Sequence, residues 1–329
     1  MLGRWRVLAA LLAALLVAPL SGVLSPAAAF DLQGHRGTRG LAPENTLAAF
    51  ERALRLGVTT LELDVMLTAD GELVISHDPA LNPDLTRDAS GQWLPGPGPL
   101  IRALTFAQLQ AYDVGRVKPG SRTARDFLQQ QAVDGQRVPR LSDLFARAAA
   151  LGAREVRYNI EIKRNPQEPE KYGDLPALVD AVVAAVTRAG VGPHALIQSF
   201  DWNVLQRVQQ VAPQLATSYL SIQRPQMNNI EAPAWTAGFT VAAQGSVPKM
   251  VKAAGGRWWA PMFRDLTPEL VREAQALGIK VVPWTVNETA DMERVIDLKV
   301  DGLITDYPDR AREVMARRGL PLPAAWPAR

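Results

Sequence analysis

The chain has 329 residues, with 36 Lys and Arg against 33 Asp and Glu and no cysteine. A chain without cysteine has no disulfides, no zinc–thiolate site and no lipid attached through a thiol. Loss of Arg4 and Arg6 with an N-terminal leader would lower the net charge from +3 to +1, so we expect no nucleic-acid partner. This length supplies enough core for one domain.

Residues 1–29 are typical of a secretory signal peptide. A basic start is followed by an apolar run over 7–20 and by small residues that end at Ala29. We expect cleavage after Ala29, which leaves residues 30–329 as a periplasmic or secreted domain with no stable membrane insertion. An uncleaved membrane anchor is the alternative, since no charged residue lies between the basic start and Asp31.

Residues 31–82 hold two of the three histidines in the chain. A strand over 31–34 ends in glycine, so His35 and Arg36 fall in a functional loop directly after it. The apolar spacing after Thr46 predicts a helix that Thr46 caps and a glycine ends. This arrangement concentrates the candidate chemistry near the start of the domain.

Two carboxylates lie on the next predicted strand, residues 59–67. Its side chains alternate, which puts Glu62 and Asp64 on the same face. An Asp-Gly turn and a second strand over 72–76 then bring the chain back to His77. An unpaired charge on a buried strand is costly, so the carboxylates favour a bound cation over a solvated face.

Eight motifs, taken in order, resemble the glycerophosphodiester phosphodiesterase family. They are HRG (35–37), PENT (43–46), ELDV (62–65), SHDP (76–79), NIEIK (159–163), QSF (198–200), WTVN (284–287) and DGLITDYP (301–308). The resemblance runs from about Leu32 to Pro308. It implies hydrolysis of small-molecule glycerophosphodiesters to sn-glycerol 3-phosphate and an alcohol, with His35 and His77 as the general acid and base.

Helices and strands alternate along most of the chain, which favours a parallel (β/α)₈ TIM barrel over an open sheet. Further strands are predicted over 157–163, 195–199, 216–221, 240–243, 258–260, 279–285 and 302–305. Helices are predicted over 141–151, 175–189 and 203–211. The pattern does not fix the strand count between 221 and 260.

Residues 80–138 differ from the rest, because they are rich in Gly, Pro and polar residues. This composition predicts an irregular insertion after the second strand, over the mouth of the barrel. One short helix is expected over 104–109, with Thr105 as its cap. The insertion is either a determinant of substrate choice or a solvent-facing excursion without such a role.

A metal site is predicted at the barrel mouth, where the C-terminal ends of the strands meet. Glu161 and Lys163 face the barrel axis on the strand over 157–163, beside Glu62 and Asp64. Three carboxylates outnumber one lysine, so a hard divalent cation with oxygen ligands suits them better than an internal ion pair. We expect Glu62, Asp64 and Glu161 to bind Ca²⁺ or, second in preference, Mg²⁺.

Substrate-binding residues are predicted at the same mouth. Arg36 and Lys163 are expected to neutralise the phosphoryl oxygens. Gln198 and Trp284 end two further strands, and Trp284 is either a wall of the glycerol pocket or an ordinary core residue. Glu44 is expected to orient Arg36 or to bind substrate, with a structural role in its loop as the alternative.

Two other functions remain open. A barrel phosphodiesterase acting on intact lipid, such as one resembling sphingomyelinase D or a phosphoinositide phospholipase C, would carry an apolar rim, which the polar stretch 118–136 lacks. An exported binding protein without turnover would lack a histidine or carboxylate that this chain retains. His194 precedes a strand at the stability-bearing end of the barrel, so we expect no chemistry from it. The pattern sets no oligomeric state.

Overall fold

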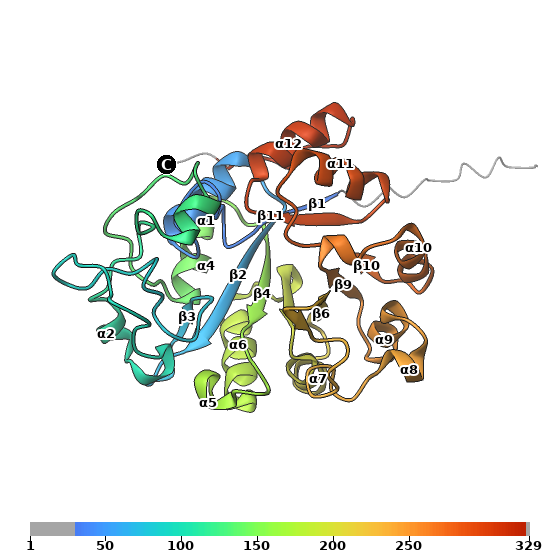
Figure 1. Ribbon diagram of the computed structural model, residues 1–329, viewed down its shortest axis with the longest axis horizontal. Coiled ribbons are helices and arrows are strands. Elements are labelled where there is room, and N and C mark those ends of the chain that lie inside the picture. The colour runs from blue at the N-terminus through green and yellow to red at the C-terminus, as the bar shows by residue number, and fades with distance from the viewer. Residues whose placement is uncertain (1–29, 327–329) are drawn as a thin grey trace, which may run out of the picture.

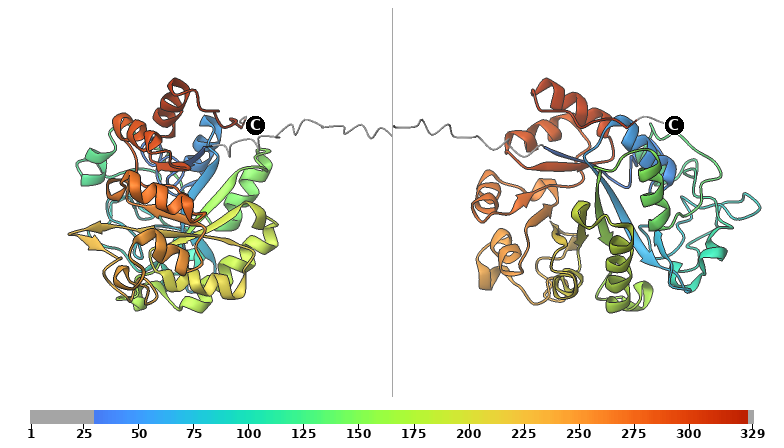
Figure 2. Two further views of the ribbon diagram at one scale, coloured as in Figure 1. Left: turned by 90° about the vertical axis from the view of Figure 1, so that its right-hand side faces the viewer. Right: turned by 180° about the vertical axis from the view of Figure 1, so that it is seen from behind.

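A computed structural model describes residues 30–326, in which eight parallel strands form a barrel surrounded by helices (Figures 1 and 2). In chain order the barrel strands are β1 (Asp31–Gly34), β2 (Thr60–Leu67), β4 (Arg157–Ile162), β5 (Ala195–Ser199), β6 (Ala216–Ser221), β9 (Trp258–Pro261), β10 (Lys280–Val281) and β11 (Gly302–Thr305). They pair in the order β10-β9-β6-β5-β4-β2-β1-β11. Backbone hydrogen bonds of 2.9 Å from Asp301 to Val281 and from Ile304 to Pro283 join β11 to β10. The fold is the predicted TIM barrel.

Helices pack around the outside of this barrel. The main ones are α1 (Leu47–Leu56), α4 (Leu141–Ala150), α6 (Leu175–Ala189), α7 (Trp202–Val211), α9 (Val247–Ala253), α10 (Pro268–Ala276), α11 (Thr289–Asp297) and α12 (Pro308–Arg317). Shorter elements are β3 (Leu73–Ile75), α5 (Pro169–Tyr172), η2 (Gly192–His194), β7 (Gln223–Arg224), β8 (Met227–Asn228), α8 (Val241–Gln244) and η3 (Phe263–Asp265). Within residues 30–326, none of the helices is both long and apolar enough to cross a bilayer. The predicted signal peptide, residues 1–29, lies outside the described residues.

Helix α1 forms as the sequence predicts and fixes the loop that precedes it. The Thr46 hydroxyl accepts a hydrogen bond from the Ala49 N–H at the first turn. Gly57 ends the helix at a φ of 89°, a conformation that side chains with a Cβ rarely adopt. Phe50 and Leu54 are fully buried in the main core. Because both ends are held, the PENT loop has a defined position at the barrel mouth.

The predicted strand over residues 240–243 is wrong. Thr240 instead caps helix α8, its hydroxyl accepting from the Ala243 N–H, and Gly245 ends that helix in the left-handed region. Val241 followed by two alanines is compatible with a strand or a helix. The Thr240 cap and Gly245 favour the helix. Strand β6 therefore pairs directly with β9, which is the sixth strand of the barrel.

The 80–138 segment lies to one side of the barrel, next to β2 and β3 (Figure 1). Its helices are short: η1 (Ile101–Ala103), α2 (Phe106–Leu109) and α3 (Arg122–Asp126). Helix α2 begins at the predicted Thr105 cap. Strand β3 pairs antiparallel with β2, as predicted. A separate small core connects the segment to these two strands and consists of Met66, Val74, Leu81, Ile101, Leu109 and Val138.

Candidate active site

A cavity of about 200 Å³ opens at the C-terminal ends of the barrel strands. Of the ten predicted site residues, eight line it: His35, Arg36, Glu62, His77, Glu161, Lys163, Gln198 and Trp284. The other two, Glu44 and Asp64, lie behind Arg36 and contact its guanidinium. The structure thus brings together residues from across the sequence into one site, as the barrel topology predicts.

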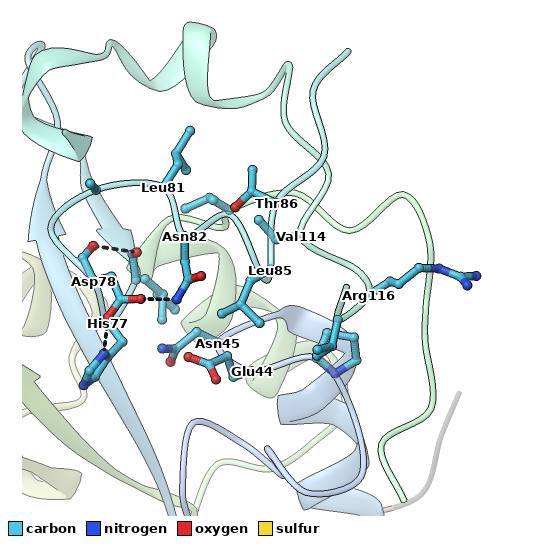
Figure 3. Close-up of a pocket in the computed structure, with 16 residues that line it drawn as sticks. Glu44, Asn45, His77, Asp78, Leu81, Asn82, Leu85, Thr86, Val114 and Arg116 are labelled. Atoms are coloured by element: carbon cyan, nitrogen blue, oxygen red, sulfur yellow. Dashed lines mark hydrogen bonds and ion pairs between the residues drawn. The ribbon is translucent and has the colours of Figure 1, made fainter. Parts of the chain in front are cut away.

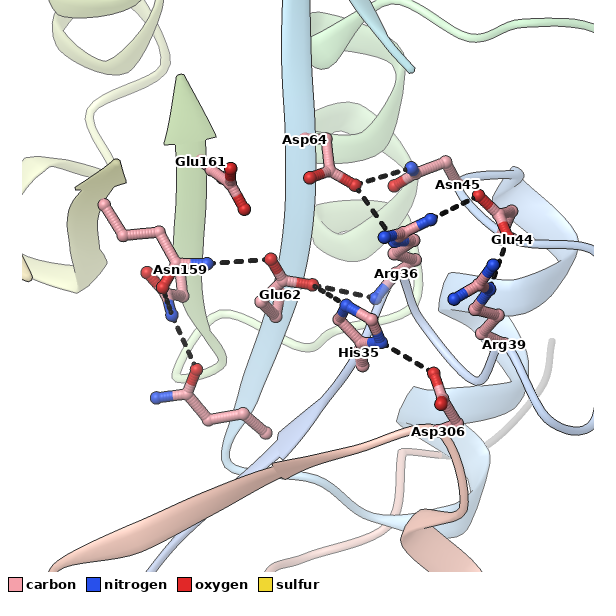
Figure 4. Close-up of polar contacts among 12 residues, drawn as sticks. His35, Arg36, Arg39, Glu44, Asn45, Glu62, Asp64, Asn159, Glu161 and Asp306 are labelled. Carbon is pink, nitrogen blue, oxygen red and sulfur yellow. Dashed lines mark hydrogen bonds and ion pairs between the residues drawn. The ribbon is translucent and has the colours of Figure 1, made fainter. Parts of the chain in front are cut away.

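His35 is held by a buried carboxylate. Its Nδ1 lies 2.6 Å from Oδ1 of Asp306 (Figure 4). Asn287 donates to the other oxygen of this carboxylate at 2.7 Å. Burial raises the pKa of Asp306, but His35, Arg39 and Asn287 together lower it below its usual value, so the carboxylate is an acceptor. Nδ1 therefore carries the proton. The second ring nitrogen, Nε2, is left free and lies 4.0 Å from Oε2 of Glu62.

His77 has a similar arrangement on the other side of the site. Its Nδ1 lies 2.7 Å from Oδ1 of Asp78, whose second oxygen accepts from Asn82 at 2.7 Å. Burial, with the charges of Arg36 and Lys163, lowers the pKa of His77 to about 4. Both histidines thus carry a carboxylate on Nδ1, which leaves Nε2 of each available for proton transfer.

Three carboxylates converge at the cavity that the two histidines line. Glu62, Asp64 and Glu161 each offer an oxygen, and these oxygens lie within 4.8 Å of one another (Figure 4). Within residues 30–326, Oδ1 of Asp64 is buried without a hydrogen-bond partner. A buried anionic oxygen without a donor is costly, and a cation would satisfy it. The set therefore fits an oxygen-coordinated divalent cation.

The electrostatics of the three carboxylates support this fit. Burial, with repulsion from Asp64 and Glu161, raises the pKa of Glu62 well above its usual value. Burial raises the pKa of Glu161 to about 7, although Lys163 opposes the shift. Asp64 is equally buried, yet Arg36 lowers its pKa. The pKa values of Glu62 and Glu161 are thus raised even though Lys163 and Arg36 lie nearby, so these two cationic groups do not fully offset burial and mutual repulsion.

The loop after β1 positions Arg36 through strained backbone. Arg36 and Asn45 have φ values of 48° and 57°, which residues other than glycine rarely adopt. The Arg36 backbone N–H donates to Glu62 at 2.9 Å, and its Nη1 donates to Glu44 at 2.6 Å. Asn45 Nδ2 donates to Asp64 at 2.9 Å. The strained loop thereby supplies donors to two of the three clustered carboxylates.

Lysine and aromatic side chains complete the walls of the cavity. Lys163 Nζ lies 2.7 Å from Oε1 of Glu161 and 3.8 Å from Oδ1 of Asp64, so the internal ion pair that was the alternative to a metal site is present beside the carboxylate cluster. Trp284 packs edge-on against Phe200, with ring centroids 5.2 Å apart, and its Nε1 donates to a backbone carbonyl. The aromatic pair gives the cavity an apolar wall, and Lys163 Nζ lies 5.8 Å from the centroid of the Phe200 ring.

Residues 35–310 match the glycerophosphoryl diester phosphodiesterase family. The chain belongs to this family. A glycerophosphodiester phosphodiesterase of Caldanaerobacter subterraneus subsp. tengcongensis is 30% identical over 285 residues, covering 87% of this chain and 97% of the relative. One from Bacillus subtilis is 30% identical over 286 residues, covering 85% and 84%. A crystal structure of a candidate glycerophosphoryl diester phosphodiesterase from Silicibacter pomeroyi superposes with a TM-score of 0.80 at 38% identity, covering 91% of this chain and 96% of that one.

As a member of a hydrolase family, the chain is a phosphodiesterase. Two features of its site were not predicted from the sequence: the position of Arg39 on the cavity wall and the contact between Asp306 and His35. Arg39 lines the cavity and pairs through Nε with Glu44 at 2.5 Å. Asp306 directly follows the last barrel strand, β11, and its bond to His35 was not foreseen. A carboxylate directly after a barrel strand is a usable signal for such a role, whereas nothing in the sequence around Arg39 distinguishes it from a surface arginine.

A second, narrower cavity of about 50 Å³ lies between the PENT loop and the 80–138 segment (Figure 3). Leu81, Leu85 and Val114 form apolar walls, and Glu44 lies on the opposite side. His77 lines this cavity as well as the larger one. The 80–138 segment therefore borders the site next to one of the two histidines.

Proposed function

We propose that this phosphodiesterase hydrolyses glycerophosphodiesters to sn-glycerol 3-phosphate and an alcohol in a metal-dependent reaction with histidine acid–base catalysis. The observation that carries the proposal is the group of three buried carboxylates at the cavity that two imidazoles line, each ring held on Nδ1 by a carboxylate. A phosphodiesterase from Oleispira antarctica with the same fold, 23% identical with a TM-score of 0.63, has been crystallised with the product sn-glycerol-3-phosphate. That complex supports the choice of substrate.

Charge neutralisation is the first requirement of the reaction. Glu62, Asp64 and Glu161 would hold a divalent cation, Ca²⁺ in preference to Mg²⁺, and such a cation supplies positive charge to the phosphoryl oxygens. Lys163 and Arg36 line the same cavity and add two fixed cationic groups. The Phe200–Trp284 wall offers an apolar surface for the carbon atoms of the glycerol moiety.

Proton transfer is the second requirement. One imidazole takes a proton from the attacking oxygen, of water or of a substrate hydroxyl, as the new P–O bond forms. The other, protonated on both nitrogens, gives its Nε2 proton to the leaving alkoxide as the old P–O bond breaks, so protons and bonds balance. Attack by a substrate hydroxyl would give a cyclic phosphate, which water then opens in a second step of the same kind. Asp306 and Asp78 keep the proton of each ring on Nδ1, which leaves Nε2 to exchange protons with the substrate. The carboxylates also stabilise each ring when it is doubly protonated.

The test is release of sn-glycerol 3-phosphate from a panel of glycerophosphodiesters, measured by a coupled assay with and without EDTA. EDTA should abolish turnover, and added Ca²⁺ or Mg²⁺ should restore it. Substitution of any of the three carboxylates by its amide, as in Glu62→Gln, should weaken metal binding and lower the rate together. Full activity of the chelated protein would overturn the metal assignment, and no release from any diester would overturn the substrate assignment.

Export to the periplasm or the medium is part of the same proposal and rests on the composition of residues 1–29. Intact-mass analysis of protein from those fractions should give an N-terminus at or near Phe30. Recovery of the full-length chain only in membranes would show that the leader is an anchor.

A further inference from the structure

Polar side chains fill the barrel axis beneath the three carboxylates. Asp31, Gln33, Asn159 and Gln198 come from three different strands, and each is at most 3% exposed. Short hydrogen bonds connect all four to one another and to Glu62 at the mouth. Burying polar side chains costs desolvation free energy that apolar side chains at the same positions would not cost. A buried polar network of this kind therefore suggests a functional role.

The direction of this hydrogen-bonded chain is set at its lower end. Oδ2 of Asp31 accepts from Nε2 of Gln33 at 2.8 Å, and its Oδ1 accepts from the Thr60 hydroxyl at 2.7 Å and forms an ion pair with Arg157 at 2.8 Å. An ionised carboxylate only accepts hydrogen bonds. Gln33 therefore turns its amide nitrogen toward Asp31 and its oxygen, Oε1, upward.

Asn159 fixes the amide orientation of Gln198. Its Nδ2 donates to Oε1 of Gln33 at 2.7 Å and to Oε1 of Gln198 at 2.9 Å. Its own Oδ1 is buried and has no hydrogen-bond partner among the described residues. The reversed amide would place that oxygen against two acceptors, so the two donated bonds hold Asn159 in this orientation despite the unsatisfied oxygen.

Gln198 in turn presents its amide nitrogen to the metal site. Its Nε2 donates to Oε1 of Glu62 at 2.8 Å, while the Arg36 backbone N–H donates to Oε2 at 2.9 Å. One neutral donor on each oxygen fixes the plane of the carboxylate and leaves its remaining lone pairs for a ligand. Groups that orient a metal ligand in this way strongly affect metal affinity.

We propose that Asn159 is a positioning residue for the metal site. Its amide nitrogen donates to the oxygens of Gln33 and Gln198, and the second bond keeps the amide nitrogen of Gln198 directed at Glu62. The inference rests on the proposed metal-dependent function. It assigns Gln198 to the support of Glu62, in addition to its place on the cavity wall, and it gives the polar interior of the barrel a role in cation affinity.

Two isosteric substitutions distinguish the positioning of Gln198 by Asn159 from a general effect of buried charge on cation affinity. In Asn159→Asp the new carboxylate has no proton to give, so it competes with Glu62 for the amide nitrogen of Gln198. In Gln33→Glu the new carboxylate still accepts from Asn159 and leaves the direction at Gln198 unchanged, and its conflict is with Asp31 below. Both variants add one buried negative charge on the barrel axis.

The experiment is calorimetric titration of Ca²⁺ and of Mg²⁺ into metal-free wild type and the two variants, with folding checked by circular dichroism. Asn159→Asp should weaken binding about 10- to 100-fold, the usual range for a lost supporting contact, and Gln33→Glu should stay within about threefold of wild type. If Asn159→Asp does not fold, the uncharged Asn159→Leu replaces it, with a smaller loss in the same direction.

The outcomes distinguish this inference from the proposed function. Wild type that binds no divalent cation would overturn both. Wild type that binds, with an equal affinity in a folded Asn159→Asp or Asn159→Leu variant, would overturn the positioning role alone. An equal loss in Asn159→Asp and Gln33→Glu would also overturn it, because buried charge would then account for the effect.

Discussion

The protonation of each histidine of the site depends on burial and on the carboxylate that its Nδ1 contacts. His35 is buried next to Asp306, and burial lowers its pKa even though the carboxylate opposes the shift. His77 is subject to the same effect, with two nearby cations in addition. Burial thus disfavours the doubly protonated form of both rings, and a bound phosphodiester anion would favour protonation of the ring that acts as the acid.

The first prediction is that His35→Ala and His77→Ala each lower kcat by on the order of 10²-fold or more, because proton transfer to and from the substrate is lost. The measurement is steady-state release of sn-glycerol 3-phosphate by folded, metal-loaded protein. His194→Ala is the matched control, since His194 lies in η2 before β5, at the opposite end of the barrel. Equal losses from all three variants would mean that the first two histidines have structural roles.

At the residue scale, local patterns predicted which side chains meet, but not the bonds they make. Alternation along β2 and β4 is enough to place Glu62, Asp64 and Glu161 on the barrel axis. The bond between His35 and Asp306 joins residues 271 apart in sequence. Such a pairing depends on barrel closure and on the rotamers of both residues, which spacing does not contain.

Among the elements, the 80–138 segment differs most from a regular barrel, and it contacts the site directly. The Phe127 ring lies under the guanidinium of Arg39, 4.5 Å from its centroid. Gln130 donates from Nε2 to the Arg39 backbone carbonyl at 2.7 Å. The segment therefore holds Arg39 in place on the cavity wall, where a cation can meet an anionic substrate.

The second prediction follows from this contact. Phe127→Ala should raise KM for a glycerophosphodiester about two- to fivefold, the value of a cation–π contact of roughly 0.5–1 kcal/mol, with kcat little changed. Without the ring of Phe127, the Arg39 side chain would sample several rotamers, and substrate binding would have to order it at a cost in conformational entropy. Leu128→Ala is the matched control, because the neighbouring Leu128 side chain is 85% exposed. Identical kinetics for the two variants would show that Arg39 does not depend on the segment.

Element prediction succeeded where caps and apolar periodicity agreed, as in α1, and failed where the sequence was short and ambiguous. Val241 is followed by two alanines, and no periodicity distinguishes helix from strand over so few residues. The sequence pattern did not predict how the 80–138 segment packs. Its small core depends on contacts with β2 and β3 that composition does not specify.

For the whole molecule, the charged site has an energetic cost that depends on pH. The pKa of Glu161 is raised by burial to about 7, so the folded metal-free protein holds a proton there that the unfolded chain releases near 4.5. This contribution to stability is fully present below pH 4.5 and is lost as pH rises through 7. The raised pKa of Glu62 acts in the same direction.

The histidines act in the opposite direction, but over a different range. With the pKa of His77 lowered to about 4, the unfolded chain binds a proton near pH 6.5 that the folded protein does not. Stability from this source is present above about pH 6.5 and is lost on acidification toward pH 4. Between pH 6.5 and 8 the carboxylates are therefore the main contributors to any change.

The last prediction is that metal-free protein becomes less stable from pH 6.5 to 8, by on the order of 1 kcal/mol from Glu161, or roughly 2 °C in Tm. Scanning calorimetry in EDTA should show this decrease, and Glu161→Gln should show a smaller one because its side chain does not ionise. Saturating Ca²⁺ should reverse the decrease, since ionised carboxylates bind the cation and binding stabilises only the folded state. A Tm that does not change with pH and that Ca²⁺ does not raise would mean that Glu62 and Glu161 do not carry raised pKa values and that the three carboxylates do not bind the ion.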